Sequence, residues 1–149
     1  MTATSMTLVT LSVVLLAAPA PPPLPEKADL SPEQLRKTAT HVITGMVQAV
    51  YERKETKGSW EYTHYLAEVK VQEVEKGKGL AKDALTYVRY WTKRYRGLFP
   101  PPDTNGHRGL PKPNETLRIY LAQNAYDGFT KDNKDGGFNV IGANGFERR

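Results

Sequence analysis

Apolar side chains recur at every second position in several separate stretches of the chain, which is the period of a β-strand. In the stretch Trp60–Val74, one face carries Tyr65, Ala67 and Val69, and the other carries Glu, Lys and Gln. The alternation changes phase after Val71, which predicts a β-bulge. Five strands are predicted in this way: His41–Tyr51, Trp60–Val74, Leu85–Tyr95, Leu117–Leu121 and Phe138–Phe146.

Polar, glycine-rich and proline-rich segments separate these strands. Gly45 predicts a bulge or sharp bend within the first strand, and the polar run Glu52–Ser59 is interpreted as a turn. The segment Phe99–Pro113 contains five prolines, which predicts a long irregular connection. The segment Ala125–Gly137 predicts a polar loop.

A short helix is expected ahead of the first strand. Ser31 can cap it, Pro32 fits the first helical position, and Gln34 completes a capping box. Residues with β-branched side chains take over after Ala39, so the helix is expected to end near that residue.

Five short strands with irregular connections favour a small barrel over a sandwich, which normally needs about seven strands. The long first and second strands, each with a bulge signal, fit a partly open barrel. We therefore predict an all-β fold, a small five-stranded OB-like Greek-key barrel with a short N-terminal helix. Residues 30–149 are expected to form this single domain.

The N-terminal segment has the layout of a secretory signal. The apolar run Leu8–Ala18 is followed by small residues, and it is shorter than the roughly 20 residues that span a bilayer. We predict a signal peptide over residues 1–20, either cleaved or retained as an N-terminal anchor, and a proline-rich linker over residues 21–29. The expected location is outside the cell, in the periplasm or in the cell envelope.

The chain has a formal net charge of +5, and all its Lys and Arg residues lie beyond residue 26. This surplus favours an anionic partner, although a role in solubility alone explains it equally well. The chain contains no cysteine, which excludes disulfides, thiolate zinc sites and a cysteine nucleophile. The expected partner is a protein or an anionic polymer, either a polysaccharide or a nucleic acid, and the oligomeric state is left open.

The predicted third strand combines aromatic and basic side chains. Aromatic planes interleaved with cations can stack on bases or sugars, and OB-type barrels bind ligands on this part of the sheet. Alternatively, the aromatic rings pack between the sheet and a loop, with the cations solvated above them. Trp60, Tyr62 and His64 on the neighbouring strand extend either the platform or the core. The candidate ligand-binding residues are Arg89, Tyr90, Trp91, Lys93, Arg94, Tyr95 and Arg96, with His107 and Arg108 in the following loop.

Strand alternation divides this stretch between two faces. One face is expected to carry Tyr87, Arg89, Trp91, Lys93 and Tyr95. The other is expected to carry Val88, Tyr90, Thr92 and Arg94.

The order of these motifs resembles the netrin-type module, the OB-like barrel shared with tissue inhibitors of metalloproteinases. The residues that carry the resemblance, between Thr40 and Asn124, are Val42, Gly45 and Val47, then Val74, Lys76 and Gly77, then Tyr87–Tyr90, Gly109–Leu110 and Thr116–Leu121. The resemblance implies the fold and a general binding role. The family's inhibitors present an N-terminal cysteine to the zinc of the protease, and this chain has none, so inhibition of metalloproteinases is not implied.

Candidate chemistry for catalysis or metal binding is sparse. His41, His64 and His107 show no metal-binding spacing, and none of the four serines lies in a G-x-S-x-G motif. We therefore expect no catalytic residues, no metal and no cofactor. The favoured function is an exported, non-catalytic binding module that acts through strand three and the loop after it. The alternatives are a small extracytoplasmic hydrolase or protease inhibitor acting through loop 97–113, and a structural cell-envelope domain.

Overall fold

A computed structural model describes residues 28–99, 101, 106–123 and 136–149. The predicted signal over 1–20 lies outside these residues, as do most of the linker 21–29 and of the loop 125–137. Within the described ranges, no helix is both long and apolar enough to cross a bilayer. The elements are α1 (Pro32–Thr38), β1 (His41–Lys57), β2 (Trp60–Lys76), β3 (Leu85–Tyr95), β4 (Thr116–Gln123), β5 (Phe138–Val140) and β6 (Phe146–Arg148).

The capping box predicted for the helix is confirmed. The Ser31 side chain accepts a hydrogen bond from the Gln34 backbone N–H at 3.2 Å, and the Gln34 side chain accepts one from the Ser31 N–H at 2.9 Å. Pro32 lies in the first turn, where its missing N–H costs nothing. The helix ends at Thr38 because Ala39 is already extended.

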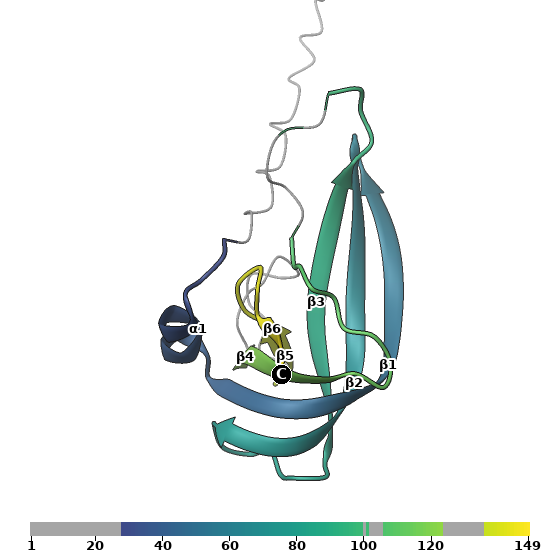
Figure 1. Cartoon of the computed structure of the whole chain (residues 1–149). Helices are drawn as coiled ribbons and strands as arrows, with labels where there is room; N and C mark the ends of the chain where they lie inside the picture. Colours follow the sequence, from purple (N-terminus) through teal and green to yellow (C-terminus); the bar gives the residue numbers. More distant parts are fainter. Residues whose placement is uncertain (1–27, 100, 102–105, 124–135) are drawn as a thin grey trace, which may run out of the picture.

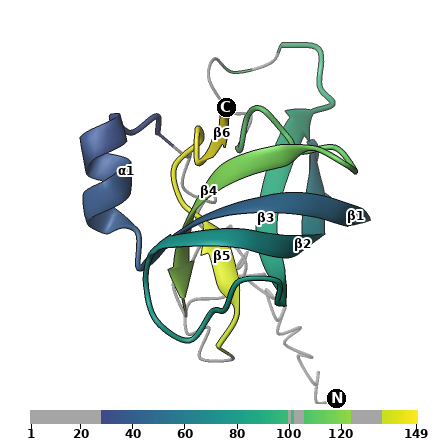
Figure 2. The ribbon, with the colours of Figure 1, turned by 60° about the horizontal axis from the view of Figure 1, so that its bottom comes forward.

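Five strands close into a ring in the order β1-β2-β3-β5-β4-β1, and β6 pairs with β4 outside the ring. The β3–β5 pairing is parallel, and the other neighbours are antiparallel. In Figure 2, β4, β1 and β2 cross the front of the barrel and β3 stands behind them. The prediction of a small all-β, OB-like five-stranded barrel with a short N-terminal helix is confirmed.

β-Bulges allow the long strands to curl around the barrel. On β2, Gln72 and Glu75 are extra residues that have no Cα partner on β1. Gly45 lies at one of these register shifts, and a Cβ there would be 2.4 Å from a methyl carbon of Val69. The irregularities predicted at Gly45 and after Val71 are therefore one and the same bulge, with Gln72 as the extra residue opposite Thr44 and Gly45. A glycine is needed at position 45 because β1 and β2 approach closely there.

Side chains from all six strands fill the barrel interior. Tyr90 lies at one end of this core, where its ring stacks on Tyr65 at 4.9 Å and meets the edge of Phe146 at 5.0 Å. A second, smaller cluster attaches α1 to the outside of the barrel through Leu35 and Val42. The residues of the main core are Ile43, Val47, Ala67, Val69, Val71, Val88, Tyr90, Leu117, Ile119, Leu121, Val140 and Phe146.

Two strand boundaries differ from the prediction. β1 continues through Lys57, so the segment Glu52–Ser59 is mostly strand, and the turn to β2 is only Gly58 and Ser59. The predicted fifth strand is instead the two short strands β5 and β6. The first error arose because charged residues occupy both faces of β1 there, which removes the apolar alternation.

The extra length of β1 forms part of a three-stranded extension that projects beyond the barrel. β4 pairs with β1 only as far as Met46, and β5 pairs with β3 only at Val88 and Arg89. Figure 1 shows the three strands rising together above the barrel, with β1 at the outer edge. We call residues 51–57, 60–66 and 89–95 the extension.

Candidate functional site

The pairing register assigns each side chain of the extension to one of two faces, because directly paired residues of antiparallel strands point to the same side. The inner face continues the barrel interior through Tyr90, and the outer face is the opposite one. The outer face consists of Tyr51, Leu66 and Arg89; Arg53, His64 and Trp91; Glu55, Tyr62 and Lys93; and Lys57, Trp60 and Tyr95. The inner face consists of Glu52, Tyr65 and Tyr90; Lys54, Thr63 and Thr92; and Thr56, Glu61 and Arg94.

Charge is divided unequally between these faces. The outer face carries four permanent cations, Arg53, Lys57, Arg89 and Lys93, and one carboxylate, Glu55. The inner face is balanced, because its two cations lie among two carboxylates: Lys54 and Arg94 with Glu52 and Glu61. The basic surplus of the extension is therefore on its outer face.

Aromatic rings hold two of these cations in place. The Lys93 ammonium lies 4.8 Å from the centre of the Trp60 ring, and that of Lys57 lies 5.9 Å from the centre of the Tyr62 ring. Trp60 in turn meets the edge of Tyr95 at 5.0 Å. These are cation–π distances, so the rings attract the cations without neutralising them.

Two cations of the outer face have no carboxylate within ion-pair distance in the part of the chain that the structure describes. Lys93 is only 6% exposed, and its ammonium contacts the Trp60 ring and not a carboxylate. Arg53 lies across from His64. The Lys57 ammonium lies 3.1 Å from Glu55, and its hydrogen bond and charge lower the pKa of that carboxyl below its usual value. An anion that reached this face would therefore find positive charge that Glu55 compensates only in part.

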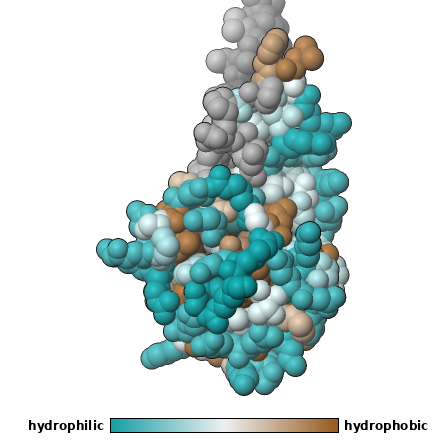
Figure 3. All heavy atoms as spheres, viewed as in Figure 1, coloured by the Kyte–Doolittle hydropathy of each residue, from teal (hydrophilic) through white to brown (hydrophobic). Residues whose placement is uncertain are grey.

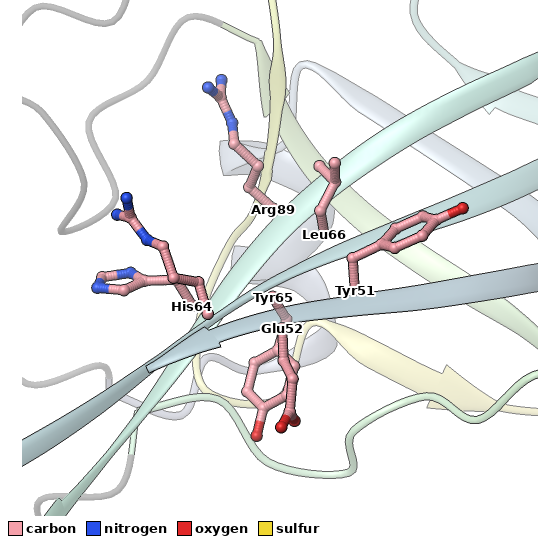
Figure 4. A pocket seen from close by; sticks show the side chains of 7 residues that line it. Tyr51, Glu52, His64, Tyr65, Leu66 and Arg89 are labelled. Atoms are coloured by element: carbon pink, nitrogen blue, oxygen red, sulfur yellow. The ribbon is translucent and has the colours of Figure 1, made fainter. Parts of the chain in front are cut away.

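A hollow of about 280 Å³ lies at the barrel end of the outer face. In Figure 4, Arg89, Leu66 and Tyr51 rise from one side of the strands, and Tyr65 and Glu52 point to the other. The residues lining the hollow are Tyr51, Glu52, Arg53, His64, Tyr65, Leu66 and Arg89.

His64 is one of the residues that line the hollow. Burial lowers its pKa, and a contact with Glu55 at 3.3 Å opposes that shift. The cationic character of the outer face therefore comes from its Arg and Lys residues.

The division of strand three between two faces is as predicted, with Val88 and Tyr90 in the core and Trp91 and Lys93 opposite. Tyr90 is fully buried, and burial raises the pKa of its phenol well above the usual range. Trp91 is only 1% exposed. A ligand on the surface therefore cannot reach Tyr90, and it meets little of Trp91.

His107 is also buried, at 2% exposure. Its Nδ1 accepts a hydrogen bond from the Trp91 N–H at 3.1 Å, and its Nε2–H donates to the Val140 carbonyl at 2.9 Å. The ring therefore connects β3 to β5, and we do not include it in the binding surface.

The remaining predicted residues lie on three different surfaces. Arg94 is on the inner face and pairs with Glu61 at 2.9 Å. Arg96 follows the end of β3 and lies 3.8 Å from the same carboxylate. Arg108 pairs with Asp29 beyond the extension. The structure brings only Arg89, Trp91, Lys93 and Tyr95 of the predicted set together on the outer face.

Arg53 and Lys57 were not predicted as site residues, because the polar run Glu52–Ser59 was interpreted as a turn and not as part of a strand. A signal was available: in the run Tyr51–Lys57, the odd positions continue the face that Trp60, Tyr62 and His64 occupy on β2. Alternation of charged residues is a weak signal, since it also occurs on solvated strands.

Carboxylates elsewhere on the barrel are occupied by arginines. Glu75 accepts hydrogen bonds from Arg118 at 2.8 Å and from Arg149 at 2.6 Å, and it lies 3.4 Å from Arg36. Burial raises the pKa of Glu75, but Arg118 and Arg149 outweigh this and hold it below its usual value. Glu75 is therefore a structural anion. Within the described ranges, no three His, Cys, Asp or Glu side chains are grouped closely enough to hold a metal ion.

The chain matches no family model, no curated protein and no solved structure.

Proposed function

We propose that this protein is a non-catalytic binding module that holds an anionic polymer on the outer face of the extension. The observation that carries the proposal is the charge division: four cations lie among aromatic rings on the outer face, and the inner face is balanced. On the barrel, by contrast, Arg118, Arg148 and Arg149 are paired with glutamates.

The chemistry of this face suits a repeating, negatively charged chain. Arg53 and Lys57 supply exposed point charges along β1, and the buried Lys93 ammonium adds positive potential beneath the Trp60 ring. The half-buried rings of Trp60 and Tyr95 supply stacking surfaces for sugars or bases. OB-like barrels bind polymers on the β2–β3 face, which gives the location a general precedent. Binding of this kind needs no catalytic group.

We also propose that the protein acts outside the cytoplasm. The support is the sequence of residues 1–20, which has the apolar run and small-residue exit of a secretory signal. Sulfated or phosphorylated polymers of a cell surface are then the expected ligands, and nucleic acid is the other polyanion to be tested.

The proposal is tested with two double variants that remove equal charge from opposite faces. Arg53→Ser with Lys57→Ser changes the outer face, and Lys54→Ser with Arg94→Ser changes the inner face of the same strands. Binding of a fluorescent heparin fragment and of a short oligothymidylate is measured by anisotropy at several salt concentrations.

We expect the outer-face variant to weaken binding of at least one probe, with the slope of log K against log salt about 2 smaller in magnitude. The inner-face variant should keep most of the affinity. Equal losses from both variants would mean that only net charge matters, and binding unaffected by either would overturn the proposal. Capture of a protein with no salt dependence would instead favour a protein partner.

A further inference from the structure

The most exposed large apolar side chains of the described residues are Leu98, at 92%, and Phe99, at 87%. They are adjacent in sequence and follow the end of β3 at the far end of the extension. Figure 1 shows this loop at the top of the molecule, and Figure 3 shows apolar atoms there next to hydrophilic ones. Single exposed apolar residues are common on protein surfaces. Two adjacent, almost fully exposed apolar side chains at a projecting end instead indicate an interaction site.

The base of this loop is anchored to the extension. The Arg96 N–H donates to the Ser59 carbonyl at 2.8 Å, which joins the chain after β3 to the β1–β2 turn. The Tyr95 ring lies so close to Gly97 that a Cβ there would be 2.4 Å from a ring carbon. Leu98 and Phe99 therefore project from a fixed platform.

Three cations share two carboxylates at the same end of the extension as the apolar pair: Arg94 and Arg96 both contact Glu61, and Lys57 contacts Glu55, which leaves a net positive charge there. Arg94, Arg96 and Lys57 have side chains that are 72%, 56% and 61% exposed. All three lie in the last residues of β1 and β3 or directly after them, at the same end as the loop. A projecting apolar tip with a basic collar matches an interface that is apolar inside and negatively charged at its surface.

We propose that this tip, formed by Leu98, Phe99 and their basic collar, docks the protein onto an anionic lipid surface. The two apolar side chains enter the boundary between headgroups and acyl chains, and the cations face the headgroups. A projecting end suits a deformable, planar surface better than a protein pocket, which would need to enclose it. The tip borders the polymer-binding face and shares Lys57 with it, but its two apolar residues and the collar residues Arg94 and Arg96 do not belong to the outer face.

The test uses the absence of cysteine from the chain. In the full-length protein, Phe99→Cys is labelled with an environment-sensitive nitrobenzoxadiazole dye. Leu85→Cys is the matched control, because Leu85 is an exposed apolar residue, at 52%, at the opposite end of β3. Emission is recorded with vesicles of phosphatidylcholine alone and with vesicles that also contain phosphatidylglycerol. This readout is specific to the tip, so adsorption of another part of the chain does not produce it.

We expect a blue shift and higher intensity from the dye at position 99 with the anionic vesicles, a much smaller change with neutral ones, and none at position 85. Arg94→Ser with Arg96→Ser in the labelled Phe99→Cys protein should weaken the response about 25-fold, at about fivefold for each cation. An unchanged dye at position 99, or equal changes at both positions, would overturn the proposal. A response to an added protein but not to lipid would do the same and would favour a protein pocket.

Two single variants distinguish failure of the lipid-docking proposal from failure of the polymer-binding proposal. Leu98→Ser should reduce vesicle binding and leave heparin binding as it was. Arg53→Ser should weaken heparin binding and leave the dye at position 99 responsive to vesicles, because Arg53 lies near the barrel end of the extension.

Discussion

Gly77 lies in the turn after β2, where a methyl group would be doubly unfavourable. Its φ is +104°, a backbone conformation that residues with a side chain rarely adopt, and a Cβ would lie 2.2 Å from the His41 ring. That ring is buried, its Nε2 is 2.8 Å from the Lys78 carbonyl, and its edge meets Phe138 at 4.9 Å. A Gly77→Ala change must therefore strain the backbone and displace His41.

The expected cost is the sum of these effects. The positive φ costs about 1 to 2 kcal/mol. Loss of the hydrogen bond to Lys78 costs about 1 kcal/mol, and loss of the ring contact about 0.5 to 1.5 kcal/mol. We expect Gly77→Ala to lower the free energy of unfolding by about 3 kcal/mol, which lowers Tm by about 12 °C in a domain of this size.

Gly79, two residues further along the same turn, provides a matched control. Its φ is +87°, but a Cβ there would have no atom within 4 Å, so Gly79→Ala carries only the backbone cost of about 1 to 2 kcal/mol. Urea denaturation followed by circular dichroism measures both variants. In a His41→Ala background, the cost of Gly77→Ala should fall to that of Gly79→Ala. Equal costs of the two glycine substitutions in the parent chain would show that the His41 ring does not restrict position 77.

Three further predictions concern stability. Trp91→Ala should cost about 3 to 5 kcal/mol by denaturation, because the ring is buried; a cost below 1 kcal/mol would mean that it is accessible to ligand. The pKa of Glu75 is held below its usual value, so its contribution is present above the pKa of the unfolded chain and is lost as pH falls through the lower folded value. Tm should therefore fall less between neutral and acidic pH in Glu75→Gln than in the parent, and parallel Tm profiles would contradict this. Leu98→Ser with Phe99→Ser should leave Tm unchanged, since both side chains are exposed; a clear loss would show that they pack against the domain.

The barrel could be predicted from the sequence because its strands bury one face each. Apolar alternation in residues 60–74, 85–95 and 117–121 marks the strands that build the core, and the phase change after Val71 marks the bulges in β2. The extension could not be predicted in the same way. Its part of β1, from Tyr51 to Lys57, alternates between charged residues on two faces, so no apolar period reveals the strand.

Only part of the candidate site could be predicted, because a face is built by three strands. The alternation of β3 separates Tyr90 from Trp91, but one strand alone does not show which of its faces points into the core. His107 illustrates the same limit: its ring contacts Trp91 and Val140, which are 16 and 33 residues away. Contacts between residues so far apart in sequence depend on the tertiary fold, and no local sequence pattern indicates them.

Residues that carry the netrin-type resemblance have structural roles in this barrel. The Lys76 ammonium donates to the carbonyls of Arg36 at 2.8 Å and Ala39 at 2.6 Å, so it satisfies the C-terminal end of α1. Gly77 accommodates the His41 ring, and Gly45 accommodates a bulge. These three positions stabilise the barrel and its helix, and none lies on the outer face of the extension.

We propose above that an anionic chain lies along the outer face of the extension. The most direct test of this proposal is an NMR titration of the labelled protein with a heparin fragment, following side-chain signals. We predict the largest shifts at Arg53, Lys57 and the Trp60 indole, with the inner-face Lys54 little changed. Shifts centred instead on the paired barrel arginines 118, 148 and 149, or spread equally over both faces of the extension, would contradict the account.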